Sequence, residues 1–301
     1  MSLFMGIDGG GSTLRVAIID EHATIVAEVK QGTANPNLIG RDVAAAHIQA
    51  AMRDVLLQVD GTIDGVGIGI AGASAVYAND WLHGIIRDVL PSCHIAAASD
   101  NEIALVGALG KRHGILILAG TGSGVFGVNA AGDSAQVGGW GYLLGDEGSG
   151  YWMGLQALKN VADAFDRAEE SPFTEVIAET LGVTSPRHLI ESVYLSEQPI
   201  PTIANLAPIV LQLADEGMSE AQTITSQASA ALVAQAQTAM TRLQMNDPQI
   251  AFAGSIVTHD NPVSRGVCAA LGLSERPQAL YRPVIGAALL AKLTLANSEA
   301  S

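Results

Sequence analysis

Hydrophobic positions in the first third of the chain follow the pattern of an α/β protein. Short apolar or alternating runs are typical of strands, and longer stretches with apolar residues three and four apart are typical of helices. The pattern predicts strands over residues 3–8, 14–19, 24–29, 65–70 and 94–98, and helices over residues 41–57 and 80–90. Only short turns separate the first three strands, so we expect hairpins there and helical crossovers between the later strands.

The same pattern starts again near residue 114. It predicts strands over residues 114–119, 125–128 and 135–137, with a glycine-rich turn at residues 120–124. Mostly helical sequence then extends to about residue 245, followed by a strand at residues 249–252 and a last helix at residues 285–295. We therefore expect two related βββαβαβα domains, one of residues 1–109 with the C-terminal helix (about 285–301), the other of residues 110–284 with helical insertions.

The composition of the chain narrows the classes of function. The 301 residues include 30 Asp and Glu but 15 Lys and Arg, a formal charge of −15 that disfavours nucleic acid and anionic membrane surfaces as partners. Hydrophobic residues make up 49%, which indicates a large core, yet no apolar run approaches the roughly 20 residues of a membrane span. With 2 cysteines far apart, the sequence predicts a cytoplasmic protein without a disulfide framework.

Two segments match the glycine motif G-x-G-x-x-G of dinucleotide-binding proteins, but both lie in the wrong context. Residues 67–72 (GIGIAG) fall in a predicted strand, and residues 122–127 (GSGVFG) lead into another strand. The motif binds a pyrophosphate between a strand and a helix, so we do not expect a dehydrogenase. The sequence also lacks the G-x-x-x-x-G-K-[ST] motif of P-loop enzymes.

The turn at residues 8–13 (DGGGST) has the composition of a phosphate-binding loop. Consecutive backbone N–H groups can point at one anion, and hydroxyl groups add donors. The residues that would do so are Gly9, Gly10, Gly11, Ser12 and Thr13. Asp8, at the end of a predicted strand, is a candidate Mg²⁺ ligand, directly or through water. Residues 120–124 (GTGSG) repeat this chemistry, which favours a polyphosphate ligand over two ordinary hairpins.

These two loops, the repeated order of elements and residues 253–255 (AGS) resemble the phosphate and adenosine motifs of the actin/hexokinase/heat-shock ATPase superfamily. Within it, the chain resembles the N-acetylglucosamine kinase branch, which is grouped with the BadF/BadG-type ATPases. Residues 138–149 (GGWGYLLGDEGS) are similar to that kinase's sugar-binding stretch, and Asn35 and residues 99–100 (SD) follow the family's order. The resemblance covers essentially the whole chain, with residues 173–215 alike in architecture alone. It implies an α/β fold of two actin-like (ribonuclease H-like) domains that flank a nucleotide and sugar cleft.

The resemblance also implies roles for individual residues. Ser12 and Thr121 would contact the phosphates of ATP, and Asp100 would be the catalytic base. The other nucleotide-binding positions in the second half are Gly122, Gly217, Gly254 and Ser255. The sugar-binding positions, besides Asp100, are Asn35, Ser123, Gly124, Gly139, Trp140, Gly141, Tyr142 and Asp146.

The position of Asp100 supports this role independently. It follows the strand predicted at residues 94–98, and open α/β sheets bind ligands at the carboxyl ends of their strands. Phosphoryl transfer to an alcohol needs a carboxylate that accepts the hydroxyl proton. A structural role stays open, because Ser99 or Asp100 could cap the next helix. Glu147 could likewise cap a helix that starts near Ser149.

We therefore predict an ATP- and Mg²⁺-dependent kinase that phosphorylates an amino sugar, N-acetylglucosamine first, at its C6 hydroxyl. Glucosamine kinase, an ATPase activator of the BadF type and a binding regulator without catalysis are the alternatives. The iron–sulfur cluster of such an activator needs four thiolates, and a homodimer would supply four from Cys93 and Cys268, but outside the family's cluster positions. The Cys-rich zinc motif of the ROK sugar kinases is missing. The expected partners are ATP and a small amino sugar, and a homodimer stays open.

Overall fold

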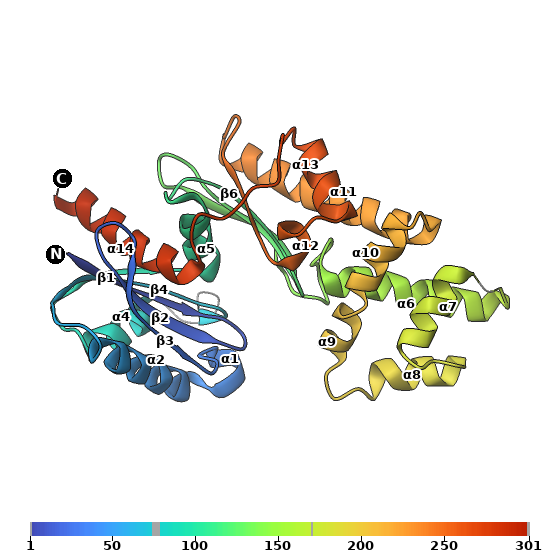
Figure 1. Ribbon diagram of the computed structural model, residues 1–301, viewed down its shortest axis with the longest axis horizontal. Coiled ribbons are helices and arrows are strands. Elements are labelled where there is room, and N and C mark those ends of the chain that lie inside the picture. The colour runs from blue at the N-terminus through green and yellow to red at the C-terminus, as the bar shows by residue number, and fades with distance from the viewer. Residues whose placement is uncertain (1, 74–78, 170, 300–301) are drawn as a thin grey trace. The chain divides into compact units, whose positions relative to one another are not determined.

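The computed structural model describes residues 2–73, 79–169 and 171–299 (Figure 1). Its internal contacts divide the chain into two compact units. The first unit comprises residues 1–114, 128–132 and 279–301, and the second comprises residues 115–127 and 133–278. The C-terminal helix therefore belongs to the same unit as the N-terminal strands.

The first unit is built on a five-stranded sheet with the strand order β3-β2-β1-β4-β5. The strands are β1 (Leu3–Gly9), β2 (Leu14–Ile19), β3 (Ile25–Gln31), β4 (Ile63–Ile70) and β5 (His94–Ala98). The first three strands are antiparallel neighbours, whereas β4 is parallel to β1 and β5 is parallel to β4. The predicted hairpins and crossovers are confirmed, and the carboxyl ends of β1, β4 and β5 lie at one edge of the sheet.

Helices cover both faces of this sheet (Figure 1). They are α1 (Pro36–Ile39), α2 (Arg41–Leu56), α4 (Asn79–Arg87), α5 (Asp100–Leu109) and α14 (Pro283–Glu299). Side chains of α2 and α4 share one core with the sheet, and those of α5 and α14 share another. A Cβ atom on Gly6 or Gly67 would lie 1.9 or 1.8 Å from a carbonyl oxygen of α14. Gly67 is therefore a packing position, which agrees with the rejection of a dinucleotide motif at residues 67–72.

The second unit is built on a four-stranded sheet with the strand order β8-β7-β6-β9. The strands are β6 (Gly114–Ala119), β7 (Ser123–Val128), β8 (Ser134–Gly138) and β9 (Ile250–Ala253), and β9 is parallel to β6. The helices are α6 (Gly150–Arg167), α7 (Pro172–Thr180), α8 (Pro186–Tyr194), α9 (Pro199–Ala204), α10 (Ala207–Asp215), α11 (Ser219–Arg242), α12 (Ser255–Thr258) and α13 (Pro262–Ala270). In the part of the chain that the structure describes, this sheet has no counterpart of β5, so the second repeat is shorter than the first.

The hydrophobic pattern located most elements closely. The strands predicted at residues 94–98 and 114–119 coincide with β5 and β6, whereas the last helix extends beyond the predicted range at both ends.

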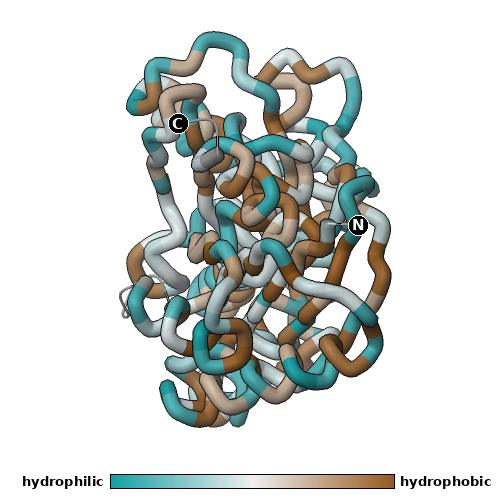
Figure 2. The backbone as a smooth tube through the Cα atoms, turned by 90° about the vertical axis from the view of Figure 1, so that its left-hand side faces the viewer, coloured by the Kyte–Doolittle hydropathy of each residue, from teal (hydrophilic) through white to brown (hydrophobic). Residues whose placement is uncertain are grey.

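Figure 2 shows hydrophobic stretches (brown) that alternate with hydrophilic ones (teal) along the backbone. Among the described residues, the helices are too short or too polar to cross a bilayer.

Candidate active site

Two carboxylates of the first unit lie at the carboxyl edge of its sheet. Asp8 is near the end of β1, and Asp100 is close behind the end of β5. Burial raises the pKa of Asp8 to about 6; Arg15 and Arg282 oppose this shift and the charge of Asp100 adds to it. Burial also raises the pKa of Asp100, against the backbone N–H of Asn101. The two carboxylates are close enough to repel each other, which suits a site that takes up a cation.

The capping role that stayed open for residues 99–100 belongs to Ser99. Its Oγ accepts a hydrogen bond from the backbone N–H of Glu102 at 3.1 Å, which makes Ser99 the N-cap of α5. Asp100 is the first residue of the helix, so its carboxylate is not needed as the cap. It therefore remains available as a proton acceptor at the edge of the sheet.

The cap of α6 is Ser149, whose Oγ accepts a hydrogen bond from the backbone N–H of Trp152 at 3.0 Å. Ser149 is fully buried, whereas Glu147 is exposed. The capping role considered for Glu147 is therefore wrong, because a serine nearer to the first turn already accepts the hydrogen bond.

The glycine turn of the first unit is open. The N–H of Gly10 donates to the carbonyl oxygen of Thr13 at 2.8 Å and closes the turn. A Cβ atom on Gly10 would meet only that oxygen, at 3.6 Å, and a Cβ atom on Gly11 would meet nothing within 4 Å. Neither residue has a positive φ. Because the fold does not require glycine at these positions, their bare backbone is best explained by the close approach of a ligand.

Two hydroxyl groups complete the open turn. The Oγ of Ser12 lies 3.5 Å from the Oγ1 of Thr13, and Ser12 is exposed. Gly9 differs from its neighbours, because a Cβ atom there would lie 2.5 Å from the side chain of Ile70. Of the three glycines, Gly9 thus serves packing, while the other two leave room for an anion.

Asn35 is connected to this turn through Thr33, which the sequence analysis missed. The Oγ1 of Thr33 donates to the carbonyl oxygen of Gly10 at 3.1 Å and accepts from the N–H of Asn35 at 3.1 Å. The Oδ1 of Asn35 accepts from the N–H of Asn37 at 2.9 Å and caps α1. A lone threonine between strand and helix carries no sequence signal of its own.

The glycine turn of the second unit is packed against protein atoms. A Cβ atom on Gly122 would lie 2.7 Å from Oδ2 of Asp146, and one on Gly124 would lie 3.0 Å from the backbone nitrogen of Gly139. The Oγ of Ser123 donates to the carbonyl oxygen of Glu147 at 2.8 Å. The structure therefore brings together Gly122, Ser123, Gly124 and Asp146, which were predicted from distant parts of the sequence.

Asp146 is the buried carboxylate of the second unit. It is 8% exposed and has a φ of 62°, an uncommon conformation for a residue with a side chain. Its Oδ1 accepts from the backbone N–H of Gly141 at 3.2 Å. Burial raises the pKa of Asp146, and the hydrogen bonds from Gly141 and Ser123 oppose this shift. The carboxylate thus holds the glycine segment at residues 138–141 next to the turn at residues 120–124.

Trp140 and Tyr142 present their rings to solvent, at 74% and 41% exposure. They follow Gly138 and Gly139, which have φ values of 72° and 69°. A Cβ atom on Gly138 would lie 2.5 Å from Oε1 of Gln235, an oxygen that is buried without a hydrogen-bond donor among the described residues. Gln235 is a further residue that sequence analysis missed, since nothing in α11 distinguishes it from the other glutamines.

The start of α12 lies against the second glycine turn. A Cβ atom on Gly254, whose φ is 85°, would lie 2.4 Å from the carbonyl oxygen of Ala119. The N–H of Gly150, at the start of α6, donates to the carbonyl oxygen of Gly120 at 2.7 Å. Ser255 follows Gly254 and is exposed. The starts of two helices and the glycine turn therefore form one group of segments, with helix N-termini suited to anions.

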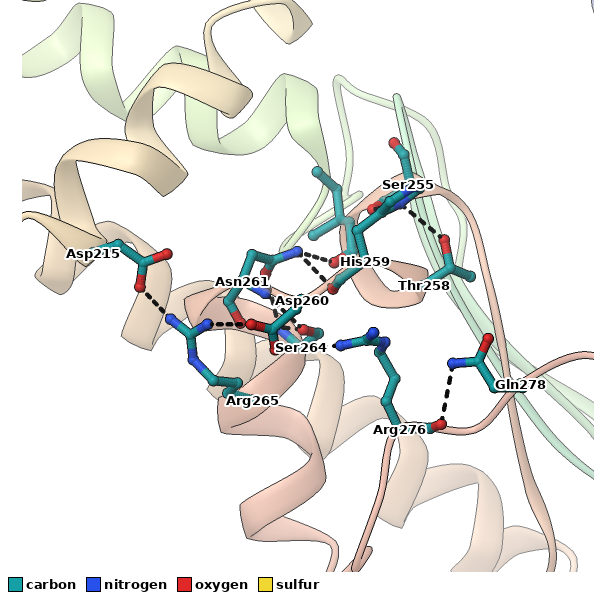
Figure 3. Close-up of polar contacts among 11 residues, drawn as sticks. Asp215, Ser255, Thr258, His259, Asp260, Asn261, Ser264, Arg265, Arg276 and Gln278 are labelled. Atoms are coloured by element: carbon teal, nitrogen blue, oxygen red, sulfur yellow. Dashed lines mark hydrogen bonds and ion pairs between the residues drawn. The ribbon is translucent and has the colours of Figure 1, made fainter.

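Gly217 follows the end of α10, where Asp215 belongs to a network of ion pairs (Figure 3). It has a φ of 92° in the turn after α10, two residues from Asp215. Arg265 of α13 pairs with Asp215 and also with Asp260 at 2.9 Å, and Arg276 pairs with Asp260 at 3.3 Å. The network joins the turn at Gly217 to the segment behind α12, and sequence spacing gave no sign of it.

Within the described ranges, no group of three or more His, Cys, Asp and Glu residues could hold a metal ion by itself. A Mg²⁺ ion that binds with ATP needs only one or two carboxylates, because phosphate oxygens and water complete its shell. Asp8 and Asp100 satisfy this requirement, and a cation would relieve their burial and mutual repulsion.

Comparisons with known proteins agree with this arrangement. An N-acetylmuramic acid/N-acetylglucosamine kinase of Clostridium acetobutylicum is 30% identical over 267 residues, 87% of each chain. A glucosamine kinase of Vibrio cholerae is 33% identical over 184 residues, 59% of this chain and 60% of the relative. The crystal structure of a candidate N-acetylglucosamine kinase from Chromobacterium violaceum shares the fold, with a TM-score of 0.73 at 24% identity over 96% of this chain and 99% of the other.

The predicted fold of two actin-like α/β domains is thereby confirmed, and so is the predicted resemblance to the N-acetylglucosamine kinase branch. The model of the BadF/BadG/BcrA/BcrD ATPase family matches residues 5–291, which is nearly the whole sequence. The chain therefore belongs to the BadF/BadG/BcrA/BcrD ATPase family.

Proposed function

We propose that this protein transfers the γ-phosphoryl group of ATP to the C6 hydroxyl of an amino sugar, with N-acetylglucosamine as the first candidate. The observation that carries the proposal is the position of Asp100 at the carboxyl edge of the sheet, where burial raises the pKa of its carboxylate. Because Ser99 caps α5, this carboxylate is not needed as the helix cap. Relatives that are named as kinases of this sugar class support the same reaction.

In this reaction Asp100 accepts the proton of the sugar hydroxyl while the hydroxyl oxygen attacks the γ-phosphorus and ADP leaves. A raised pKa makes the carboxylate a better proton acceptor than an ordinary aspartate. Asp8 would hold Mg²⁺, which when bound neutralises charge on the β- and γ-phosphates. Because ATP is the donor, we propose that the protein acts in the cytoplasm.

The phosphate oxygens of ATP would lie on the bare backbone of Gly10 and Gly11 and on hydroxyl groups of both turns. These hydroxyl groups belong to Ser12, Thr13 and Thr121. The start of α12 at Gly254 and Ser255 adds N–H groups to the same task, next to Gly122. Gly217 would border the nucleoside, on the support of the ion pairs that join its turn to Asp260.

The sugar would be bound by a small set of polar groups and one aromatic ring. Asn35, Ser123 and Asp146 carry the hydrogen-bonding groups, and the exposed indole of Trp140 can cover the apolar face of a pyranose. The backbone beside Asp146 carries no side chains at Gly124, Gly139 and Gly141. An exposed Tyr142 completes the segment.

Glucosamine is the second candidate substrate, because a glucosamine kinase matches this chain at 33% identity. The activator function has less support. Its cluster needs four thiolates, and the two cysteines of this chain, Cys93 and Cys268, lie in different units.

The test is an ADP-release assay with purified protein, ATP and Mg²⁺ against glucosamine, N-acetylglucosamine, N-acetylmannosamine and glucose, with mass analysis of the products. We expect a phosphorylated amino sugar in amounts that match the released ADP. ADP release without any phosphorylated sugar would contradict a kinase and favour an ATPase, and phosphorylation of glucose alone would contradict the amino-sugar assignment.

A further inference from the structure

Asn261 is a buried polar side chain of the second unit that the proposed mechanism does not use. It is 6% exposed and lies between α12 and α13, at the N-cap of α13. Its Oδ1 accepts a hydrogen bond from the backbone N–H of Ser264 at 3.0 Å. The backbone N–H of Asn261 in turn donates to Oγ of Ser264 at 3.1 Å and completes a capping box. The side-chain oxygen therefore serves the start of α13.

The nitrogen of the same amide group serves α12 and the residue after it. Nδ2 donates to the carbonyl oxygen of Ile256 at 2.6 Å and to that of His259 at 3.0 Å (Figure 3). Because α12 ends at Thr258, the helix itself offers no N–H group four residues beyond Ile256. These contacts also fix the orientation of the amide, since only its nitrogen can donate to two carbonyl oxygens. One side chain thus connects α12 to α13 by three hydrogen bonds.

A second capping box shows that such a cap does not require an amide. Ser171 caps α7 in the same way, with its Oγ 3.3 Å from the backbone nitrogen of Thr174, and a proline follows the cap in both helices. Serine and aspartate cap helices about as well as asparagine does. What asparagine adds at position 261 is the NH₂ group, and both of its hydrogen bonds go to residues 256–259. The choice of asparagine is therefore explained by α12 and not by α13.

Residues 254–259, which we call the α12 segment, contain two of the residues to which the proposed function assigns the nucleotide. A Cβ atom on Gly254 would lie 2.4 Å from the carbonyl oxygen of Ala119, beside the glycine turn of this unit. The Oγ1 of Thr258 donates to the carbonyl oxygen of Gly254 at 2.8 Å. A ring nitrogen of His259 lies 3.0 Å from the carbonyl oxygen of Ser255. The segment is bonded internally, so a displacement of its end carries over to Gly254 and Ser255.

We propose that Asn261 is a positioning residue for the nucleotide, because its Nδ2 holds the α12 segment where Gly254 and Ser255 meet ATP. The inference rests on the proposed function, which places ATP at these two residues. Asn261 does not touch the nucleotide in this proposal and acts through the carbonyl oxygens of Ile256 and His259. Without Nδ2 these oxygens lose their donor, and the α12 segment shifts until water can replace it.

Asn261→Asp tests the proposal, because it keeps the size and the capping oxygen and replaces the donor with an acceptor. We expect the Kd for ATP with Mg²⁺, measured by calorimetry on the whole protein, to rise about tenfold, the effect of about one lost hydrogen bond. The Kd for N-acetylglucosamine should stay within about twofold of the wild type, since the sugar-binding residues do not contact Asn261. In the phosphorylation assay, the KM for ATP should rise while kcat stays within about twofold. Asn261→Ser, which keeps a capping hydroxyl and adds no charge, should weaken ATP binding similarly.

Ser171→Ala is the matched control, since it removes the capping box of α7 in the same unit and should lower Tm without changing either Kd. An unchanged Kd for ATP in both variants of Asn261 would overturn the positioning role. An equal loss of affinity for ATP and sugar, an equal loss of ATP affinity in Ser171→Ala, or failure of both variants to fold would also overturn it, because Asn261 would then serve stability alone.

Calorimetry separates this proposal from the proposed function, because it measures ATP binding without turnover. If the wild type binds ATP but phosphorylates no sugar, the kinase assignment fails and the two variants still decide the role of Asn261. A wild-type protein that binds no ATP would overturn both.

Discussion

The two glycine turns at residues 8–13 and 120–124 follow equivalent strands and have similar composition, but the protein surrounds them differently. In the first turn, side chains on Gly10 and Gly11 would meet little or nothing. In the second, side chains on Gly122 and Gly124 would run into Asp146 and the backbone of Gly139. The first turn leaves space that the proposed ligand could occupy, whereas protein atoms fill the space beside the second.

The difference extends to the carboxylates of the two units. Burial raises the pKa of Asp8 and of Asp100, and the charge of Asp100 raises the pKa of Asp8 further. Burial also raises the pKa of Asp146, but hydrogen bonds from the backbone of Gly141 and Ser123 oppose this shift. The protein partly compensates the charge in both units, by Arg15 and Arg282 at Asp8 and by backbone hydrogen bonds at Asp100 and Asp146. The units differ in the compensating groups, since Asp8 depends on the charges of arginines and Asp146 on hydrogen bonds from neighbouring backbone. Substitutions in the two units should therefore separate chemistry from architecture.

The largest effect is expected for Asp100→Asn. It removes the proton acceptor, which is worth about 10²–10⁴-fold in rate, so kcat should fall by at least about 100-fold while ATP affinity and Tm change little. The control is Ser99→Ala, which removes the cap and should cost about 1 kcal/mol of stability without a comparable loss of kcat. Turnover of Asp100→Asn within tenfold of the wild type would exclude general-base catalysis by this residue.

Gly10→Val and Gly122→Val compare the turns directly. Gly122→Val should lower the free energy of unfolding by about 1–3 kcal/mol, because the new side chain displaces Asp146. Gly10→Val should keep the stability of the wild type and weaken ATP binding, because its side chain occupies only ligand space. Thermal melts measure the stability of both variants, and titrations measure their affinity for ATP. A strong loss of stability in Gly10→Val would contradict the difference between the turns.

Asp8→Asn should change how stability depends on pH. An acid whose pKa rises from 3.8 to about 6 on folding binds its proton more tightly in the folded state, so stability falls as pH rises from about 4 through 6. The variant lacks this loss. Its free energy of unfolding, relative to that of the wild type, should therefore increase by about 1–2 kcal/mol from pH 5 to pH 8. Denaturant unfolding at both pH values measures it, with the exposed Asp166→Asn as control. The variant should nevertheless lose ATP-dependent turnover, and a variant that keeps both activity and the wild-type pH profile would contradict the role of Asp8.

The smallest effect on stability is expected for Gln235→Leu. It removes an acceptor that is buried without a donor among the described residues, so the free energy of unfolding should stay within about 1 kcal/mol of the wild type. The KM for the sugar should rise and the KM for ATP should not, because Gln235 lies against Gly138 of the proposed sugar-binding segment. Gln237→Leu, on the exposed side of α11, serves as the control. An equal change in both KM values would mean that Gln235 supports the unit as a whole.

Several features of this protein were determined by its sequence alone. The spacing of hydrophobic residues located the hairpins and crossovers of the first sheet, because strands and helices each place every second or every third to fourth side chain on the buried face. The glycine turns and the proposed sugar-binding stretch at residues 138–149 indicated the family, which the comparisons show. These signals are local, so a single chain segment suffices to carry each of them.

The tertiary structure decided what depends on contacts between distant segments. It assigned the caps to Ser99 and Ser149, separated the open turn at Gly10 from the filled turn at Gly122, and placed Thr33 and Gln235 beside predicted residues. A pKa shift such as that of Asp8 also arises only after folding, since burial and neighbouring charges come from other strands and helices. The sequence identifies the candidate residues for the chemistry, and the packing of remote segments determines which of them are buried and which are exposed.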